Sequence, residues 1–219
     1  MTVEAKTYTI PPTQLIPNSP YQLIHYPRLL HTLVSSPSFN PTAIFDLFAS
    51  NGWQSQWIAR YGRTQKSHYH STAHEAMVVI SGEGATIRFG VADENADPLA
   101  EPEAPGLLLE AQLGDVFILP AGVAHKTHDP RPDAESLKFM APKDVKNGRS
   151  AREYFEAQEV KGEFMMMGAY PEGNEWDFMV GGEHEGRFEE VWNVEKPGSD
   201  PVLGASEEGI CGLWKSSTV

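Results

Sequence analysis

Apolar residues in the middle of the chain occur in short runs that are separated by turn-forming residues. Runs of this length, rich in β-branched and aromatic residues, are typical of β-strands. They predict strands at 22–26, 57–61, 77–80, 85–89, 107–111, 116–119 and 137–140. Ser81-Gly82-Glu83-Gly84 lies between two of these runs and has the composition of a hairpin turn. A series of short strands with such turns favours a sandwich or a barrel.

A helical pattern is clearest just before this strand-rich region. Asn40 is a favourable N-cap, Pro41 suits the first helical position, and Gly52 lies where a helix commonly ends. Weaker patterns predict short helices at 151–157 and 183–192. The sequence shows no internal repeat, so a protein of two barrels is not expected.

The length of 219 residues fits one domain, 1–219, for which we expect an all-β fold with minor helices. We divide this domain into an N-terminal arm and helix (1–52), a barrel core (53–142) and a helical or irregular C-terminal extension (143–219). Asp93–Pro105, with its prolines and acidic residues, is expected to be a solvated loop.

The charge of the chain argues against nucleic acid and anionic membranes as partners. There are 17 Lys and Arg residues against 30 Asp and Glu residues, which gives a formal net charge of −13 without any Lys- or Arg-rich run. Nucleic acids and anionic lipids both attract basic surfaces. The N-terminus does not read as a signal peptide, and no apolar stretch approaches the ~20 residues of a membrane span. Cys211 is the single cysteine and cannot form a disulfide within the chain, so we expect a cytoplasmic protein.

The first of two stretches with metal-ligand residues contains His68, His70 and Glu75. The two histidines are two positions apart, so they project from the same face of a strand. Glu75 lies five positions after His70, an odd step that would place it on the opposite face of an unbroken strand. We therefore expect a turn at 71–73 that starts a new strand alongside the first.

The second stretch places His125 after the predicted strand 116–119 and a tight turn at Pro120-Ala121-Gly122. Together the two stretches offer three imidazoles and one carboxylate. This ligand set suits a first-row divalent ion, whereas calcium and magnesium prefer sites rich in oxygen ligands.

The spacing within these stretches resembles the two sequence motifs of the cupin superfamily. The first motif (Gly, five residues, His-X-His, four residues, Glu, six residues, Gly) is matched by Gly62, His68, His70, Glu75 and Gly82. The second (Gly, five residues, Pro-X-Gly, two residues, His) is matched by Gly114, Pro120, Gly122 and His125, while Asp129 stands where the family usually has Asn.

The resemblance implies a jelly-roll barrel in which His68, His70, Glu75 and His125 hold one divalent transition metal (Fe, Mn, Ni, Cu or Zn). The C-terminal segment also resembles single-domain bacterial and fungal cupins of unassigned activity.

From this site we expect a metal-dependent oxidoreductase of the dioxygenase or oxidase type that acts on a small organic acid, phenol or enol. Two alternatives stay open, because one fold supports many reactions. One is a non-redox isomerase, decarboxylase or lyase, and the other is a non-catalytic protein that binds a metal or small ligand. A small-molecule substrate or ligand is the expected partner. A homodimer is expected because cupins often pair through sheet edges and N-terminal arms, and 1–40 could serve as such an arm.

Several other residues invite a functional interpretation. Arg60 and Arg88 are possible substrate-binding residues, because a guanidinium group suits an anionic substrate, although a solvated surface position is the alternative for both. Tyr69 has the opposite strand parity to the histidines and is expected to pack outside the barrel. Met165-Met166-Met167 is expected to fill the core rather than to bind a soft metal.

Overall fold

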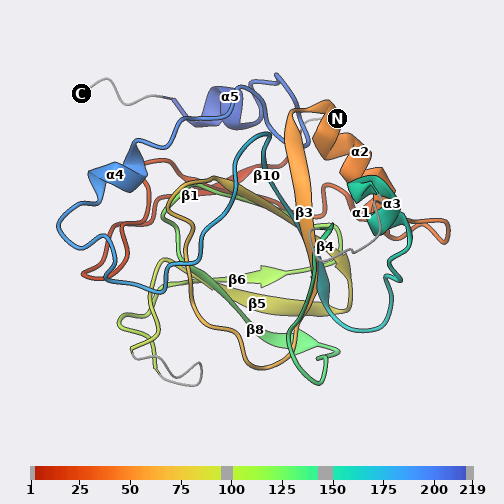
Figure 1. Ribbon diagram of the computed structural model, residues 1–219, viewed down its shortest axis with the longest axis horizontal. Coiled ribbons are helices and arrows are strands. Elements are labelled where there is room, and N and C mark those ends of the chain that lie inside the picture. Colours follow the sequence, from red (N-terminus) through yellow and green to blue (C-terminus); the bar gives the residue numbers. More distant parts are fainter. Residues whose placement is uncertain (1–2, 95–100, 143–149, 216–219) are drawn as a thin grey trace.

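The computed structural model describes residues 3–94, 101–142 and 150–215. Within these ranges the chain forms two antiparallel sheets and a few short helices (Figure 1). The strands are β1 (Lys6–Tyr8), β2 (Leu23–Tyr26), β3 (Trp53–Arg60), β4 (Glu75–Ser81), β5 (Gly84–Phe89), β6 (Leu107–Ala111), β7 (Val116–Leu119), β8 (His125–Arg131), β9 (Lys138–Met140) and β10 (Met165–Pro171). The helices are α1 (His31–Val34), α2 (Thr42–Ser50), α3 (Ala151–Glu156), α4 (Glu189–Trp192) and α5 (Ile210–Leu213).

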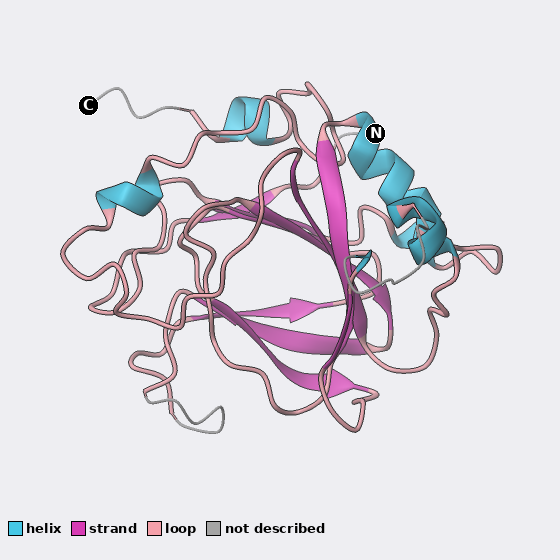
Figure 2. Ribbon diagram, viewed as in Figure 1, coloured by secondary structure: helices cyan, strands magenta, loops and turns pink. Residues whose placement is uncertain are grey.

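The two sheets lie opposite each other and enclose one apolar layer (Figure 2). The larger sheet has seven strands in the order β1-β2-β7-β4-β10-β3-β9, and the smaller has three in the order β6-β5-β8. Strand alternation directs Met77 and Val79 of β4 and Ile87 and Phe89 of β5 into the layer between the sheets. This arrangement is the expected all-β fold with minor helices, a barrel of the jelly-roll type.

A second apolar layer covers the outer face of the larger sheet. Ala76, Val78 and Ile80 of β4 point into it and meet residues of the helices, such as Phe48 of α2 and Phe155 of α3. Both faces of β4 are therefore covered, and all seven of its residues are buried. This explains why its sequence is a continuous apolar run instead of an alternating one.

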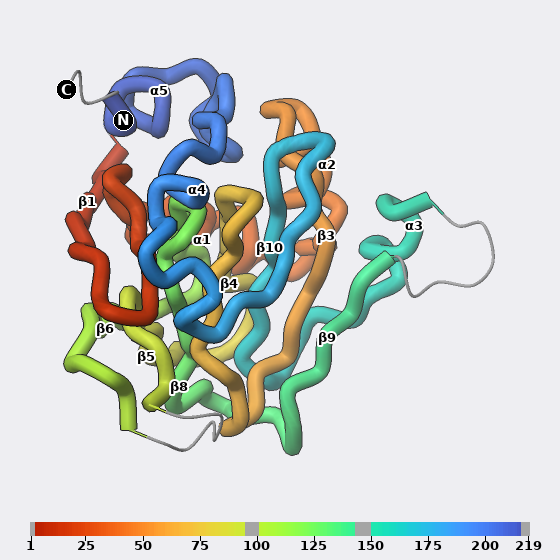
Figure 3. Tube along the Cα trace, turned by 60° about the vertical axis from the view of Figure 1, so that its left-hand side comes forward, coloured from red at the N-terminus to blue at the C-terminus, as the bar shows by residue number. Residues whose placement is uncertain are grey.

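The structure confirms the predicted strands and the helix after Asn40, and it adds one central strand that the pattern did not predict. β10 pairs with β3 on one side and with β4 on the other (Figure 3). Met165 and Met167 of this strand face the outer layer and Met166 faces the inner one, which confirms that the three methionines pack in the core. The larger sheet also includes β1, β2 and β10, which lie outside 53–142.

Two other predicted segments differ in extent from the observed ones. The helical pattern at 183–192 yields only α4, because the preceding residues form turns with Gly186 at φ +74°. Residues 95–100 of the expected solvated loop lie outside the described residues. In the described part of the chain, no helix has the length and apolar character needed to cross a bilayer.

Candidate metal centre

The segment that carries His68 and His70 is held in extended form by two neighbours. On one side, His68 and His125 exchange both backbone hydrogen bonds, with N···O distances of 3.2 and 2.9 Å. On the other side, Tyr69 and Met179 exchange a second pair, at 2.8 and 3.0 Å. The histidine segment therefore lies between the start of β8 and a C-terminal segment that is more than 100 residues away in sequence.

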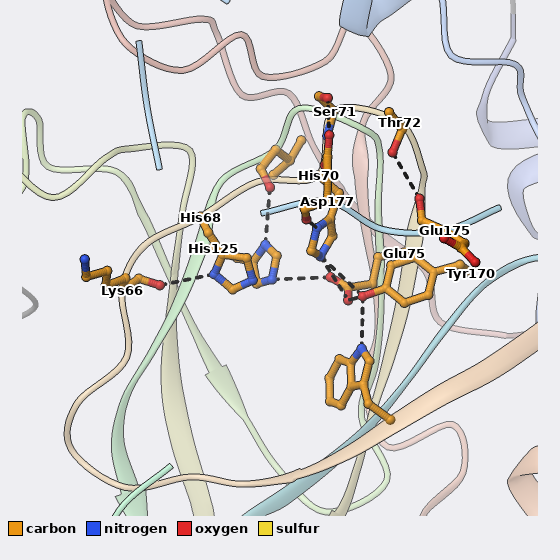
Figure 4. A network of polar contacts seen from close by, with 12 residues as sticks. Lys66, His68, His70, Ser71, Thr72, Glu75, His125, Tyr170, Glu175 and Asp177 are labelled. Carbon is orange, nitrogen blue, oxygen red and sulfur yellow. Dashed lines mark hydrogen bonds and ion pairs between the residues drawn. The ribbon is translucent and has the colours of Figure 1, made fainter. Parts of the chain in front are cut away.

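Alternation along this segment separates the histidines from Tyr69, as the sequence predicts. His68 and His70 point toward His125, and one ring nitrogen of each of the three lies within 4.8 Å of those of the other two (Figure 4). Tyr69 is fully buried in a separate apolar cluster, with Ile16 and Ala124. All three histidines are at least 90% buried.

Glu75 joins the histidines because the chain bends at Ser71 and Thr72 before β4 begins. This bend is the predicted turn, and Glu75 is the first residue of the new strand. Its carboxylate lies 3.4 Å from Nε2 of His70 and 3.3 Å from Nε2 of His125. The structure thus brings together all four residues that the motif spacing singles out.

The turn that delivers His125 depends on Gly122. Its φ of +88° lies in the left-handed region, and a Cβ there would approach Cγ1 of Val191 to 2.9 Å. His74 steadies the same turn, because its Nδ1 accepts the backbone N–H of Ala121 at 2.9 Å. His74 is buried, which lowers its pKa to about 4, and it faces away from the three histidines toward Trp214.

Each of the three imidazoles has its Nδ1 beside a backbone carbonyl oxygen. Nδ1 of His68 lies 3.1 Å from the carbonyl of Lys66, and Nδ1 of His125 lies 3.3 Å from that of Val123. Nδ1 of His70 contacts the carbonyl of Asp177. Because a carbonyl only accepts hydrogen bonds, each Nδ1 carries the proton, and each Nε2 is left with a lone pair. This is the tautomer that a metal-binding histidine needs.

The surroundings of the Glu75 carboxylate indicate that the cluster is built to bind a cation. Oε2 of Glu75 is buried and has no hydrogen-bond partner among the described residues, yet it faces the Nε2 lone pair of His125 at 3.3 Å. An anionic oxygen and nitrogen lone pairs repel one another unless a positive charge lies between them. The donor set of three imidazoles and one carboxylate therefore fits a divalent transition metal.

The electrostatics of the cluster agree with this reading. Burial and the neighbouring imidazoles hold the pKa of His68 well below its usual value, and burial lowers that of His125 as well, so both rings are neutral. Burial also acts on His70 and Glu75, but their mutual attraction outweighs it, which raises the pKa of His70 and lowers that of Glu75. The cluster thus stabilises one positive charge beside an ionised Glu75. Without a cation this charge is a proton on Nε2 of His70, and a bound cation would take its place and leave the lone pair free.

A hydrogen-bonded chain behind Glu75, which the sequence did not reveal, fixes its carboxylate. The Tyr170 hydroxyl donates to Oε1 of Glu75 at 2.5 Å, and Nε1–H of Trp57 donates to that hydroxyl at 2.9 Å. All three side chains are at least 97% buried. The pKa of Tyr170 is raised well above its usual value by burial and by the Glu75 charge, so the hydroxyl stays protonated and keeps donating.

A second support, Asp177, also lies far from the histidines in sequence. Besides its carbonyl contact with His70, its carboxylate accepts the Ser71 N–H at 2.6 Å and the Ser71 hydroxyl. Thr72 adds a hydrogen bond to the carbonyl of Glu175 at 3.0 Å. These bonds tie the 175–177 segment to the bend between His70 and Glu75 and so orient the His70 ring.

Asp177→Ala keeps the backbone carbonyl that contacts His70 but removes the carboxylate that binds Ser71. It is expected to weaken metal binding about tenfold, because the bend that positions His70 loses its support and loss of a group that orients a ligand typically costs that much. Titration of the metal-stripped protein with zinc would measure the change in affinity. Glu175→Ala is the matched control, since Glu175 contributes its backbone carbonyl to this region. Equal affinities for the two variants would show that the Asp177 carboxylate does not support the position of His70.

The four residues line a cavity of about 290 Å³ with mainly aromatic walls. The walls include Trp57, Phe139, Tyr170, Trp176 and Phe178. Arg60 and Arg88 are not among the lining residues. Arg60 binds Glu163 at 2.6 Å and the carbonyl of Glu159 at 2.7 Å, and Arg88 alternates with the inward-facing Ile87 and Phe89 of β5. A substrate role for either arginine stays a prediction.

Comparison with known proteins gives one full-length relative. No family model matches the chain. The chain is 26% identical over 215 residues to the uncharacterized protein YjlB of Bacillus subtilis (strain 168), and the match covers 96% of this chain and 97% of that protein.

The solved structures that resemble this chain include two of low similarity. They are vicilin from Corylus avellana (hazelnut), with 10% identity and a TM-score of 0.25, and the oxalate decarboxylase formate complex from Lactobacillus farciminis, with 11% identity and a TM-score of 0.30. The matches cover 68% and 80% of this chain but only 28% and 33% of those proteins. The chain thus spans a third or less of their length, and similarity at this level carries no functional argument.

Proposed function

We propose that this protein is a metal-dependent oxidoreductase of the dioxygenase or oxidase type that acts on a small organic acid, phenol or enol. The observation that carries the proposal is the convergence of three Nε2 lone pairs and the orphaned Glu75 oxygen at the wall of a cavity. His68, His70, Glu75 and His125 would hold one divalent ion: Fe, Mn, Ni, Cu or Zn. Such an ion supplies Lewis acidity and, except for zinc, redox chemistry with O₂.

The protein's own residues would hold the four ligand side chains in position and limit the access of water to them. The three Nδ1–carbonyl contacts set the ring orientations, and the Trp57–Tyr170 chain holds Oε1 of Glu75. The remaining carboxylate oxygen, Oε2, is then free to face the ion. Aromatic walls limit the access of water to the reacting groups, which strengthens electrostatic interactions inside the cavity.

Metal analysis followed by oxygen uptake tests this function. Protein purified without an affinity tag is analysed by mass spectrometry and then screened with organic acids, phenols and enols in an oxygen electrode. We expect near-stoichiometric Fe, Mn, Ni or Cu and substrate-dependent oxygen consumption that stops after chelation. Turnover without oxygen consumption would instead assign the site to a metal-dependent isomerase, decarboxylase or lyase. Binding without turnover of any compound would favour a protein that only binds a metal or ligand.

A homodimer is also proposed for this chain. β1 and β6 are the end strands of their sheets, and such edges pair readily with another chain. Sedimentation of the purified protein as a monomer would contradict this proposal.

A further inference from the structure

The cavity beside the metal centre is small and has largely aromatic walls. Its volume of about 290 Å³ lies near the lower end of the roughly 300–1,000 Å³ of small-molecule pockets. Trp57 and Phe139 have ring centroids 5.1 Å apart, and Phe139 and Trp176 have centroids 5.7 Å apart. Trp176 in turn stacks on Tyr170, with a centroid distance of 6.4 Å and an interplanar angle of 21°. One wall is thus a continuous surface of aromatic rings.

Phe178 and Trp176 connect this aromatic surface with the histidines, because each contacts one of their rings. The Phe178 ring stacks on His68, with centroids 4.2 Å apart and planes 15° apart, and Trp176 meets His70 edge-on at 5.7 Å. Phe139 and Phe178 both line the cavity and are 43% and 47% exposed, so together they leave apolar surface open to solvent there. A ring entering the cavity would cover this surface while its polar substituent reached the Nε2 cluster.

The charge of the lining argues against a compact dianion. Among the described residues that line the cavity, Lys66 is the single lysine or arginine, and its side chain is solvent-exposed. No described lining residue offers a guanidinium fork to bind a second carboxylate, and Arg60 binds Glu163 outside the cavity. Glu75 adds negative charge to the inner end.

From these observations we infer that the cavity takes a single-ring phenol or catechol in preference to a short dicarboxylic acid. The ring lies against Trp176 and Phe178, and the hydroxyl oxygen is directed to the metal centre. This inference rests on the proposed function, since the metal is what receives the hydroxyl group. It narrows the three substrate classes of that proposal to one.

Calorimetric titration under nitrogen tests the inference, because exclusion of oxygen separates binding from turnover. Catechol, oxalate and malonate are titrated into metal-analysed wild-type protein and into Trp176→Ala, Phe178→Ala and Leu108→Ala. Leu108 is a matched control, since it is a 53% exposed apolar residue on β6 that does not line the cavity. Phe178 is the second wall variant because it is 47% exposed, so its removal leaves no cavity in a closed core.

We expect catechol to bind at least about tenfold more tightly than oxalate or malonate. Trp176→Ala and Phe178→Ala are each expected to weaken catechol binding about fivefold, the effect of one aromatic contact, while Leu108→Ala leaves it unchanged. Metal-loaded protein that binds the dicarboxylates as tightly as catechol, or wall variants with unchanged affinity, would overturn the inference and leave the metal site standing. Wild-type protein that holds no metal, even after reconstitution, would overturn the proposed function and this inference together.

Discussion

Replacing His68 and His70 together with alanine is expected to lower the metal content from about one ion per chain to near zero. The double variant removes two of three converging imidazoles, and a carboxylate with one remaining histidine does not hold a transition metal firmly. Mass spectrometry of variant and wild type, purified identically without an affinity tag, measures the difference.

Thermodynamic stability provides a second readout of the same variant. An ion that binds only the folded state stabilises it by about 2.7 kcal/mol at about 100 times its Kd. Chelation is therefore expected to lower the urea midpoint of the wild type and to leave that of the double variant unchanged.

His128→Ala is the matched control for this experiment. His128 also lies on β8, three positions after His125, but it is not part of the three-histidine cluster. It should keep the full metal content and the response to chelation. If the double variant retained stoichiometric metal, the ion would have to be bound elsewhere, and the central claim about these residues would be wrong.

The strands that can be predicted from the sequence are those whose local residue pattern is typical of a strand. β5 and β7 are short apolar runs bounded by turn residues, and both were predicted. β10 was not, although it lies between β3 and β4 at the centre of the larger sheet. Its sequence, Met-Met-Met-Gly-Ala-Tyr-Pro, contains no β-branched residue. It also lacks alternation, because both of its faces are buried. This segment is a strand because it pairs with β3 and β4, which are distant in sequence.

The site shows a similar division between local and distant information. His68, His70, Glu75 and His125 follow from spacing, because each pair of positions is fixed by a strand or a tight turn. Tyr170 and Asp177 lie about 100 residues later in sequence and reach the site only through the β10 pairing and the Tyr69–Met179 bridge. Nothing in their local sequence marks them as supports of the ligands.

Gly168→Ala is expected to destabilise the protein by about 2 kcal/mol, the cost of overpacking a closed core. Gly168 lies on β10 opposite Trp57 of β3, and a Cβ at this position would lie 2.0 Å from Cε2 of the Trp57 ring. Strand propensity alone predicts the reverse, a gain of roughly 0.5–1 kcal/mol on replacing glycine with alanine. This distance is far shorter than any van der Waals contact, and the Trp57 ring is 97% buried. The steric cost is therefore expected to exceed the gain in strand propensity. Urea unfolding monitors the change.

Whether Gly168→Ala destabilises or stabilises the protein should depend on the presence of the Trp57 ring. In a Trp57→Ala background the obstructing ring is gone, and Gly168→Ala should become neutral or stabilising by about 0.5 kcal/mol, which a double-mutant cycle would detect. Gly198→Ala is the control, since a Cβ there meets no atom of the described residues within 4 Å. Because Trp57 donates to the Tyr170 hydroxyl that holds Glu75, Gly168→Ala should also weaken metal binding, whereas Gly198→Ala should not. A cost that stays the same with and without the Trp57 ring would mean that backbone strain in β10, and not this contact, requires glycine at position 168.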